Sequence, residues 1–340
     1  MFNFRYFGVA VAILLVAAGA MASNFRAADQ VYVPAAGHLS GSSGTFISDV
    51  FISNLSTDPV TVTVIYSSGP TGAQLSNFPA INLAAGERRE IIDFFPTALN
   101  LSTGFGQLIF NGCKQGTDCG PATQDANGVS PNFRNISVES RIYSIPPGTT
   151  LSGNPPTTGQ DFVGLPWYNF VSSDQAANGL DKVFITGIRN TGTTGQAGTY
   201  RSNIGLVNAS QFSTTTLVVT LFNGSTNTPI GTPFQVTLGP LGQTQQNISA
   251  MFPSFATGPT ATNAFVTVSQ TSNVPTADAP ASCLPNGCPA FFAYGSILDN
   301  ASGDATTLES QYLKPLTDAA ILAIYPGNAG KTNMHRAAKH

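Results

Sequence analysis

Histidine beside serine and aspartate is the first candidate for chemistry in this chain of 340 residues, which has three histidines. His38 lies near three serines and Asp49, and serine hydrolases need a histidine that is held by a carboxylate beside the nucleophile. His335 and His340 belong to the C-terminal tail. The sequence contains neither a Gly-x-Ser-x-Gly elbow nor a His-Glu-x-x-His motif. We therefore interpret His38 as a solvated loop histidine.

Carboxylates in the first half of the chain are the second candidate, because paired acids catalyse glycoside hydrolysis. The acids that could converge there are Asp49, Asp93, Glu139 and Asp161. A later stretch that aligns with this region has Asn203 in place of Asp49 and no clear acid in place of Asp93. Because the aligned stretch does not retain these carboxylates, we favour a structural role for Asp49 and Asp93 over catalysis. We expect Asp49 and Asn203 to hold a turn or a strand end.

Oxygen-bearing residues between 299 and 304 are a candidate calcium site. The order is Asp-Asn-Ala-Ser-Gly-Asp, and Asp299, Asn300 and Asp304 would supply the oxygen ligands that calcium prefers. The stretch lacks the EF-hand spacing, and the same residue types are common in turns. We favour a turn and keep calcium as the alternative cofactor.

The four cysteines form two close pairs, Cys113 with Cys119 and Cys283 with Cys288. Each pair falls in the corresponding loop between two predicted strands, which favours one disulfide within each pair. Zinc is the alternative, because two pairs offer four thiolates, but both gaps are longer than the roughly two residues typical of zinc knuckles. We expect two disulfides, each of which stabilises its loop more than the whole fold.

The same pattern of residues occurs twice in the chain. Residues 44–54, Gly-Thr-Phe-Ile-Ser-Asp-Val-Phe-Ile-Ser-Asn, return at 198–208 as Gly-Thr-Tyr-Arg-Ser-Asn-Ile-Gly-Leu-Val-Asn. Apolar residues then alternate with polar ones at 60–66 and 215–221, and this period of two is typical of a half-buried strand. Further strands are predicted in the same order at 81–83, 107–110 and 136–143, and at 236–238, 265–269 and 291–298. The repeat is longer than the roughly 20 to 50 residues of solenoids and propellers, so it indicates duplicated domains.

The spacing of these strands predicts the architecture. Short β-rich segments separated by Gly, Pro, Asn and Ser are typical of antiparallel sandwiches. We expect an all-β protein of two tandem antiparallel, Ig-like β-sandwich domains, each with one short helical turn, near 91–99 and 248–255. The predicted parts are a signal peptide (1–22), an N-terminal segment (23–30), domain 1 (31–166), a linker (167–182), domain 2 (183–315) and a C-terminal tail (316–340).

The predicted linker opens with the aromatic residues Trp167, Tyr168 and Phe170. Tandem domains commonly bury such residues between them, so we favour a plug at the domain junction. The alternative is an exposed platform on which the rings of a glycan stack.

The N-terminus has the features of a secretory signal. Arg5 precedes an apolar run over 7–20, and small residues precede Ser23. The run is shorter than the roughly 20 residues of a membrane span, and the mature chain has no second run of this kind. We expect a protein without a transmembrane segment, exported to the periplasm, cell surface or extracellular space.

Charge restricts the partners that we expect. Charged residues make up 9% of the chain, against about 25% in ordinary soluble domains. The net charge of -3 and the absence of a basic run give no electrostatic footprint for nucleic acid. Low charge suits self-association or contact with other envelope proteins. Seven Asn-x-Ser sequons are candidate glycan acceptors: Asn54, Asn100, Asn135, Asn208, Asn223, Asn247 and Asn300.

A resemblance supports this view of the fold. Residues 45–54, followed by the alternating valines at 60–64, resemble the opening of a repeat in uncharacterised exported bacterial proteins built of tandem Ig-like β-sandwich repeats. Residues 293–305, Ala-Tyr-Gly-Ser-Ile-Leu-Asp-Asn-Ala-Ser-Gly-Asp-Ala, resemble the closing segment of the same repeat. The resemblance implies the fold and export, and it implies no activity.

Taken with the missing catalytic motifs, these features predict a non-enzymatic secreted or cell-envelope protein that acts as a structural, adhesive or self-assembling unit. A module that binds carbohydrate or another surface polymer is the alternative. A secreted hydrolase with dispersed carboxylates is the third hypothesis.

Overall fold

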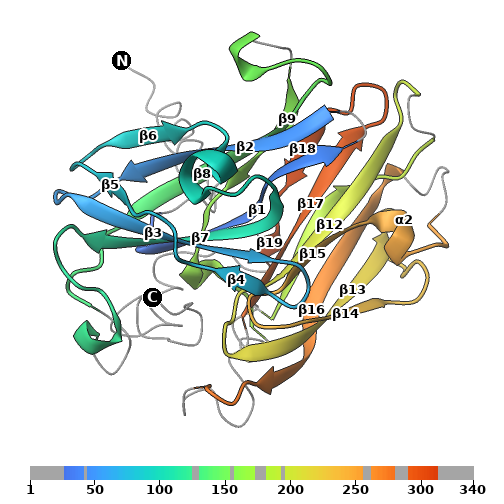
Figure 1. Ribbon diagram of the computed structural model, residues 1–340. Helices are drawn as coiled ribbons and strands as arrows, with labels where there is room; N and C mark the ends of the chain where they lie inside the picture. Colours follow the sequence, from blue (N-terminus) through green and yellow to red (C-terminus); the bar gives the residue numbers. More distant parts are fainter. Residues whose placement is uncertain are drawn as a thin grey trace, which may run out of the picture.

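A computed structural model describes residues 27–41, 44–124, 130–153, 157–172, 181–192, 196–255, 262–279 and 290–312. The predicted signal peptide, the whole predicted tail (316–340) and the second cysteine pair, Cys283 and Cys288, lie outside these ranges. The described chain is all-β and its strands pair in the antiparallel sense, as predicted. Its strands fall into a first half (β1–β10) and a second half (β11–β19), which lie side by side in Figure 1. No helix within the described ranges has the length and apolar character needed to cross a bilayer.

Two groups of strands make up the first half. One group has the order β4-β3-β7-β1, with β5 beside β3 and β10 beside β1, and the other has the order β6-β2-β8-β9. Strand β1 joins them, because its early residues pair with β7 and its last residues pair with β2. The strands are β1 (Gln30–Gly41), β2 (Gly44–Asn54), β3 (Val60–Ser68), β4 (Ala73–Leu75), β5 (Ile81–Leu83), β6 (Arg88–Ile91), β7 (Gly104–Lys114), β8 (Ile136–Ile145), β9 (Thr158–Val163) and β10 (Leu165–Pro166).

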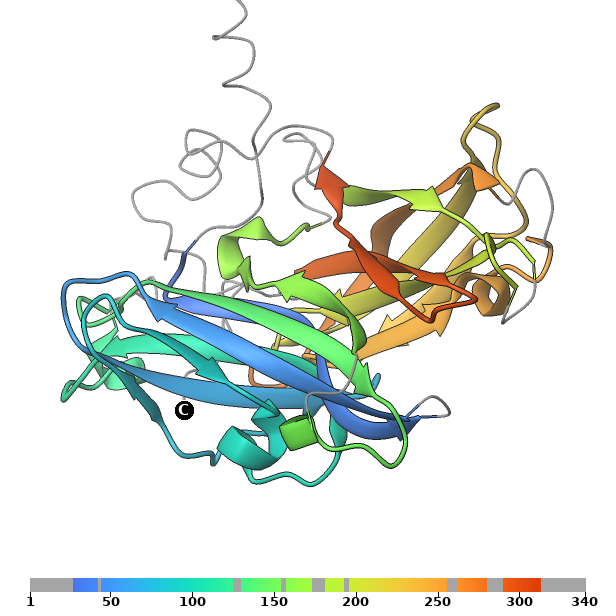
Figure 2. The ribbon, with the colours of Figure 1, turned by 90° about the horizontal axis from the view of Figure 1, so that it is seen from above.

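The second half has two sheets, with the orders β14-β13-β16-β11-β19 and β15-β12-β17-β18. The pairing resembles that of the first half, for example β13 with β16 as β3 with β7. The two halves differ in that β1 pairs with β2, whereas no pairing joins β11 to β12 within the described residues. Figure 2 shows the layers of both halves from above. The strands are β11 (Lys182–Ile188), β12 (Tyr200–Asn208), β13 (Ser213–Asn223), β14 (Phe234–Leu238), β15 (Gln243–Asn247), β16 (Ala264–Pro275), β17 (Phe291–Asp299), β18 (Ala305–Leu308) and β19 (Gln311–Tyr312).

Alternating apolar residues build the core, as the sequence predicts. Val62 and Val64 on β3 are buried, and so are Leu217 and Val219 on β13. The predicted helical turns are present as η1 (Phe95–Leu99) and α2 (Ile248–Met251). The prediction of one turn per copy is too low for the first half, because short 3-10 turns also form at η2 (Pro121–Thr123) and η3 (Leu151–Gly153), and η4 (Trp167–Asn169) follows β10. Proline, glycine and asparagine near these turns interrupt the strands.

A buried asparagine, Asn54, bonds the backbone at the corner after β2. Its side-chain N–H groups donate to the carbonyl oxygens of Asp58 and Ala84, both at 2.8 Å. Its Oδ1 accepts from the backbone N–H of Ser56 at 2.9 Å. These bonds satisfy backbone groups of two different turns, which would otherwise be left without partners inside the protein.

Asn208, at the end of β12, also bonds backbone groups of two turns through its side chain. Its side chain donates to the carbonyl oxygens of Ser213 and Gly239, at 2.7 and 2.8 Å, and accepts from the N–H of Ser210 at 3.0 Å. Both asparagines are fully buried. At two further sequons, Asn223 and Asn247, the side-chain oxygen of the asparagine likewise accepts from the backbone N–H of the serine two positions later. Four of the seven sequons therefore form Asx turns, which explains these serines without glycosylation.

Replacing Asn54 or Asn208 by alanine should lower the free energy of unfolding by about 2 to 4 kcal/mol, because buried carbonyl groups lose their donors. The matched control is Asn82→Ala, at an exposed position on β5, which should change it by less than about 0.5 kcal/mol. Urea denaturation followed by circular dichroism measures all three. Equal effects at the buried and exposed positions would contradict this role.

Candidate functional site

Backbone hydrogen bonds join the two halves directly. The N–H of Gly239 donates to the carbonyl oxygen of Pro70 at 2.8 Å, and the N–H of Gln243 donates to that of Gly69 at 2.9 Å. The carbonyl oxygen of Leu241, in the same turn of the second half, accepts from side chains of β3 and β7. We call these contacts between the turns at 69–72 and 239–243 the joint. Close backbone approach at the joint requires glycine: a Cβ on Gly72 would lie 1.8 Å from the carbonyl oxygen of Pro240.

Aromatic side chains pack along the same boundary. Phe162 meets Tyr294 edge to face, with 5.3 Å between ring centroids, and Phe170 stacks on Phe292 at 5.3 Å. Trp167 is also buried and donates its indole N–H to Asp29. Phe170 also contacts Tyr32, so its ring packs against both halves. Burial removes Trp167 and Phe170 from any exposed sugar platform. The side chain of Tyr168 lies outside the described part of the structure.

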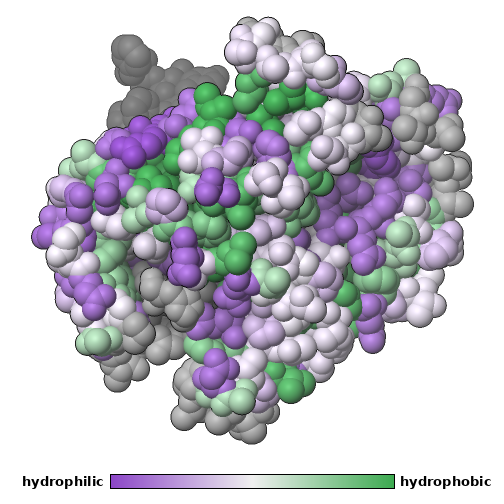
Figure 3. Space-filling model, in the orientation of Figure 1, coloured by the Kyte–Doolittle hydropathy of each residue, from purple (hydrophilic) through white to green (hydrophobic). Residues whose placement is uncertain are grey.

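Between the two halves lies a cleft of about 860 Å³, within the roughly 300 to 1,000 Å³ typical of ligand sites. One wall belongs to the first half, where the end of β1 pairs with β2 and joins its two groups of strands. The other wall is the outward face of β12, β15 and β17 in the second half. Figure 3 shows hydrophobic surface near the boundary of the halves and hydrophilic surface over β12 and β15.

The wall of the first half is largely apolar. Leu39, Phe46, Phe105 and Ile142 line it and are only half-buried, while Phe162 is fully buried at its base. Phe105 shares a face of β7 with Gln107, whose side chain bonds Leu241 of the second half, because side chains alternate between the two faces of a strand. Phe46, Ile142 and Phe162 share one face of the neighbouring strands β2, β8 and β9. These side chains face the cleft.

The wall of the second half is polar. Asn203 pairs with Ser296, and Arg201 pairs with Leu298, in the register between β12 and β17. Directly opposite residues share one face of a sheet, so these four side chains line the cleft together. Gln245 on β15 joins the same face. The prediction that Asn203 holds a turn or a strand end is wrong, because Asn203 lies within β12 and lines the cleft.

Arg201 carries the one cationic side chain of the described cleft lining, and no aspartate or glutamate lines the cleft. Its guanidinium donates to Oδ1 of Asn300 at 2.8 Å. Asn300 is 6% exposed and is held in turn by a hydrogen bond to Oγ1 of Thr199 at 3.1 Å. Within the described part of the chain, Arg201 forms no ion pair. A neutral, buried amide therefore orients the guanidinium and leaves its charge uncompensated.

The candidate calcium residues build a turn. Oδ1 of Asp299 accepts from the backbone N–H groups of Ala301 and Ser302, at 2.8 and 2.9 Å. These bonds stabilise the ionised form and lower the pKa of Asp299. Asp304 follows in the same turn, and Asn300 faces Arg201. No group of three or more His, Cys, Asp or Glu residues suited to a metal ion occurs in the described ranges.

The interpretation of His38 as a solvated loop histidine is wrong. His38 lies on β1, and its Nδ1 is 2.8 Å from Oδ1 of Asp93. The backbone of Asp93 has a positive φ of 48° and donates its N–H to Asp49, which also accepts from the hydroxyl of Tyr143. Burial and the hydrogen bond to Asp49 raise the pKa of Tyr143. Asp49 thus holds a strained turn, as predicted. His38 and Asp93 are 55 positions apart in the sequence, so spacing alone did not reveal their pairing.

The other two candidate acids lie on neighbouring strands. Asp161 on β9 pairs in register with Arg141 on β8, which in turn pairs with Asp49 on β2. Glu139 faces Phe51 across the β8–β2 pair. Of the acids considered for glycoside hydrolysis, Asp49 and Asp93 are brought together by a bond to the backbone of Asp93. This contact supports the turn rather than an arrangement of two carboxylates around a substrate.

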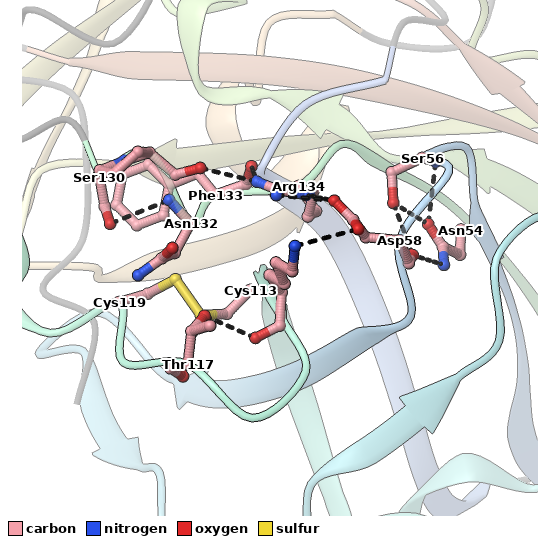
Figure 4. A network of polar contacts seen from close by, with 12 residues as sticks. Asn54, Ser56, Asp58, Cys113, Thr117, Cys119, Ser130, Asn132, Phe133 and Arg134 are labelled. Atoms are coloured by element: carbon pink, nitrogen blue, oxygen red, sulfur yellow. Dashed lines mark hydrogen bonds and ion pairs between the residues drawn. A yellow bond between two sulfur atoms is a disulfide. The ribbon is translucent and has the colours of Figure 1, made fainter.

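The predicted disulfide between Cys113 and Cys119 is present. Figure 4 shows it beside a polar network in which Arg134 bonds Asp58 at 2.7 Å. Lys114 lies 3.2 Å from the same carboxylate, and these partners lower the pKa of Asp58. The network ties the loop after β7 to the corner at Asn54, so its role is structural.

Comparison with known proteins identifies no family. No family model matches the chain, and no curated protein matches it. Among solved structures, the chain is similar to a protein described as Thermotoga maritima 1070, with 15% identity over 40% of this chain and 93% of that one, and a TM-score of 0.25. A β-glucuronidase from Bacteroides uniformis is 9% identical over 78% of this chain and 24% of its own, with a TM-score of 0.16. A lectin from Pleurotus ostreatus is 12% identical, over 90% of this chain and 97% of its own, with a TM-score of 0.11. These scores are too low to carry an argument about fold or function.

Replacing Gly72 by alanine should weaken the joint. Gly69 is the matched control, because both glycines have a positive φ, of 71° and 67°, but a Cβ on Gly69 meets nothing within 4 Å. Both variants share a backbone cost of about 1 kcal/mol, and we expect G72A to lose at least about 2 kcal/mol more stability because its Cβ displaces the facing backbone. Chemical denaturation compares the two, and equal losses would contradict close packing at the joint.

Proposed function

We propose that this protein is a non-enzymatic, exported binding module that holds a ligand in the cleft between two duplicated Ig-like sandwiches. The cleft carries the proposal, because it combines an apolar wall with an arginine that is oriented from behind by a buried asparagine. Ligand sites commonly have this composition and lie at the boundary between domains. The same feature favours binding over the structural role that the sequence placed first.

Duplication is supported by the common strand order of the two halves and by the matching bonds of Asn54 and Asn208. We propose domains at 31–166 and 183–315, as the repeat predicts. Export is supported by the signal-like N-terminus and by the disulfide in the first half, because disulfides persist in oxidising compartments.

Binding without catalysis is supported by the placement of the candidate acids. Asp49 bonds a backbone N–H and a tyrosine, and Asp299 bonds the backbone of its own turn. Neither carboxylate belongs to the cleft lining. The groups that line the cleft are amides, hydroxyls, one guanidinium and apolar side chains, which bind and orient a ligand.

A structural or adhesive unit is the second candidate function, and the joint favours it. Backbone bonds between the halves suit a rigid spacer in an envelope assembly, and the low charge of the chain permits close packing with other copies. In that case the cleft would have no ligand, and the protein would form large assemblies in solution.

Filling the cleft should abolish binding. Asn203→Trp places a large ring on the polar wall, whereas Glu90→Trp places one at an exposed position on β6 and serves as the control. In a thermal-shift screen of fatty acids and oligosaccharides, wild type and E90W should be stabilised by the same compounds, by about 2.7 kcal/mol at 100 times the Kd. N203W should show no shift. A screen in which nothing stabilises the wild type, with large assemblies seen by light scattering, would favour the second candidate.

A further inference from the structure

We infer that the cleft binds an amphipathic carboxylate, with Arg201 on the carboxylate and the wall of the first half on a hydrocarbon body. The inference rests on the proposed function and adds the chemical class of the ligand. Its basis is the juxtaposition of one uncompensated guanidinium with half-buried apolar side chains across a single cavity.

Arg201 is suited to a carboxylate head. A guanidinium has five N–H donors, and the bond to Asn300 is the one hydrogen bond that this side chain makes within the described residues. Planar guanidinium groups bind carboxylates through two parallel hydrogen bonds. The neutral amide of Asn300 does not compensate the charge, and no acid is among the lining residues that the structure describes. Asp299 and Asp304, in the turn beside Asn300, accept bonds from backbone N–H groups. The remaining N–H groups of the guanidinium are therefore available to an anion in the cleft.

The opposite wall selects the rest of the ligand. Leu39, Phe46, Phe105 and Ile142 offer no side-chain hydrogen-bonding group, and the polar side chains of this wall are Ser144, Thr158 and Gln160 on β8 and β9. A sugar lying against the four apolar side chains would leave hydroxyl groups without partners, and burying an unpartnered polar group is costly. A hydrocarbon body has no hydrogen bonds to water that it could lose there, and it covers apolar surface that is otherwise partly exposed to water. The cleft volume of about 860 Å³ is ample for a chain of ten carbons.

Polar residues around Arg201 complete the head-group site. Asn203 and Ser296 are paired across β12 and β17 beside the arginine, and Gln245 follows on β15. Amide and hydroxyl groups of this kind can donate to carboxylate oxygens or to the water that surrounds them. These three side chains therefore place neutral hydrogen-bond donors on the same wall of the cleft as Arg201.

The test is isothermal titration calorimetry of the full mature chain with decanoate and with decanol, which has the same hydrocarbon body without the charge. Decanoate should bind at least tenfold more tightly than decanol to the wild type. Arg201→Gln should weaken decanoate at least tenfold and leave decanol unchanged, which also shows that the cleft is intact. Arg201→Lys should retain part of the preference.

A second variant tests the charge with Arg201 in place. Asn300→Asp introduces a carboxylate where the amide oxygen now accepts the arginine bond, so it should weaken decanoate as R201Q does. Equal affinities for decanoate and decanol, or decanoate binding that R201Q and N300D leave unchanged, would overturn the inference.

Two further outcomes separate this inference from the proposed function. Binding of digalacturonate, but not decanoate, with loss in N203W would show that the cleft is a ligand site for an acidic sugar and that the hydrocarbon assignment is wrong. Binding of none of these probes, or binding that N203W does not affect, would contradict both the inference and the cleft as the binding site.

Discussion

A buried asparagine that bonds backbone carbonyl groups is the interaction on which the rest of this structure depends. Strand β12 ends at Asn208, and its side chain holds the carbonyl oxygen of Gly239. Its own N–H donates to Gly242. Asn208 therefore fixes the turn at 239–243, which contacts the first half. Without that turn the two halves would lack the backbone bonds that set their positions, because buried backbone groups must find partners.

The joint in turn determines the cleft. Its two walls come from different halves, so the distance between Arg201 and the apolar wall is set by contacts outside the cleft. A preformed site of this kind avoids the entropic cost of ordering its walls when a ligand binds. The aromatic pairs along the boundary, Phe162 with Tyr294 and Phe170 with Phe292, add packing that opposes rotation of one half against the other.

Sequence reasoning identified local features better than contacts between distant residues. The alternating strands, the helical turns and the Cys113–Cys119 bridge follow from periodicity and spacing, and all are present. The partner of His38 and the polar wall around Arg201 were missed. Pairing across β12 and β17 depends on register, and the cleft depends on how one half meets the other. A sequence pattern of period two predicts a strand but not which strand, or which half, its outward face will meet.

The measurement that tests the account most directly is native-state hydrogen exchange of the Gly239 and Gln243 amides, which donate across the joint. If the halves form one body with a preformed cleft, these amides should exchange through global unfolding, with the same protection as core amides of β13. Fast exchange of both amides while β13 remains protected would show that the halves separate in the native state. That result would contradict a cleft held in place by the joint.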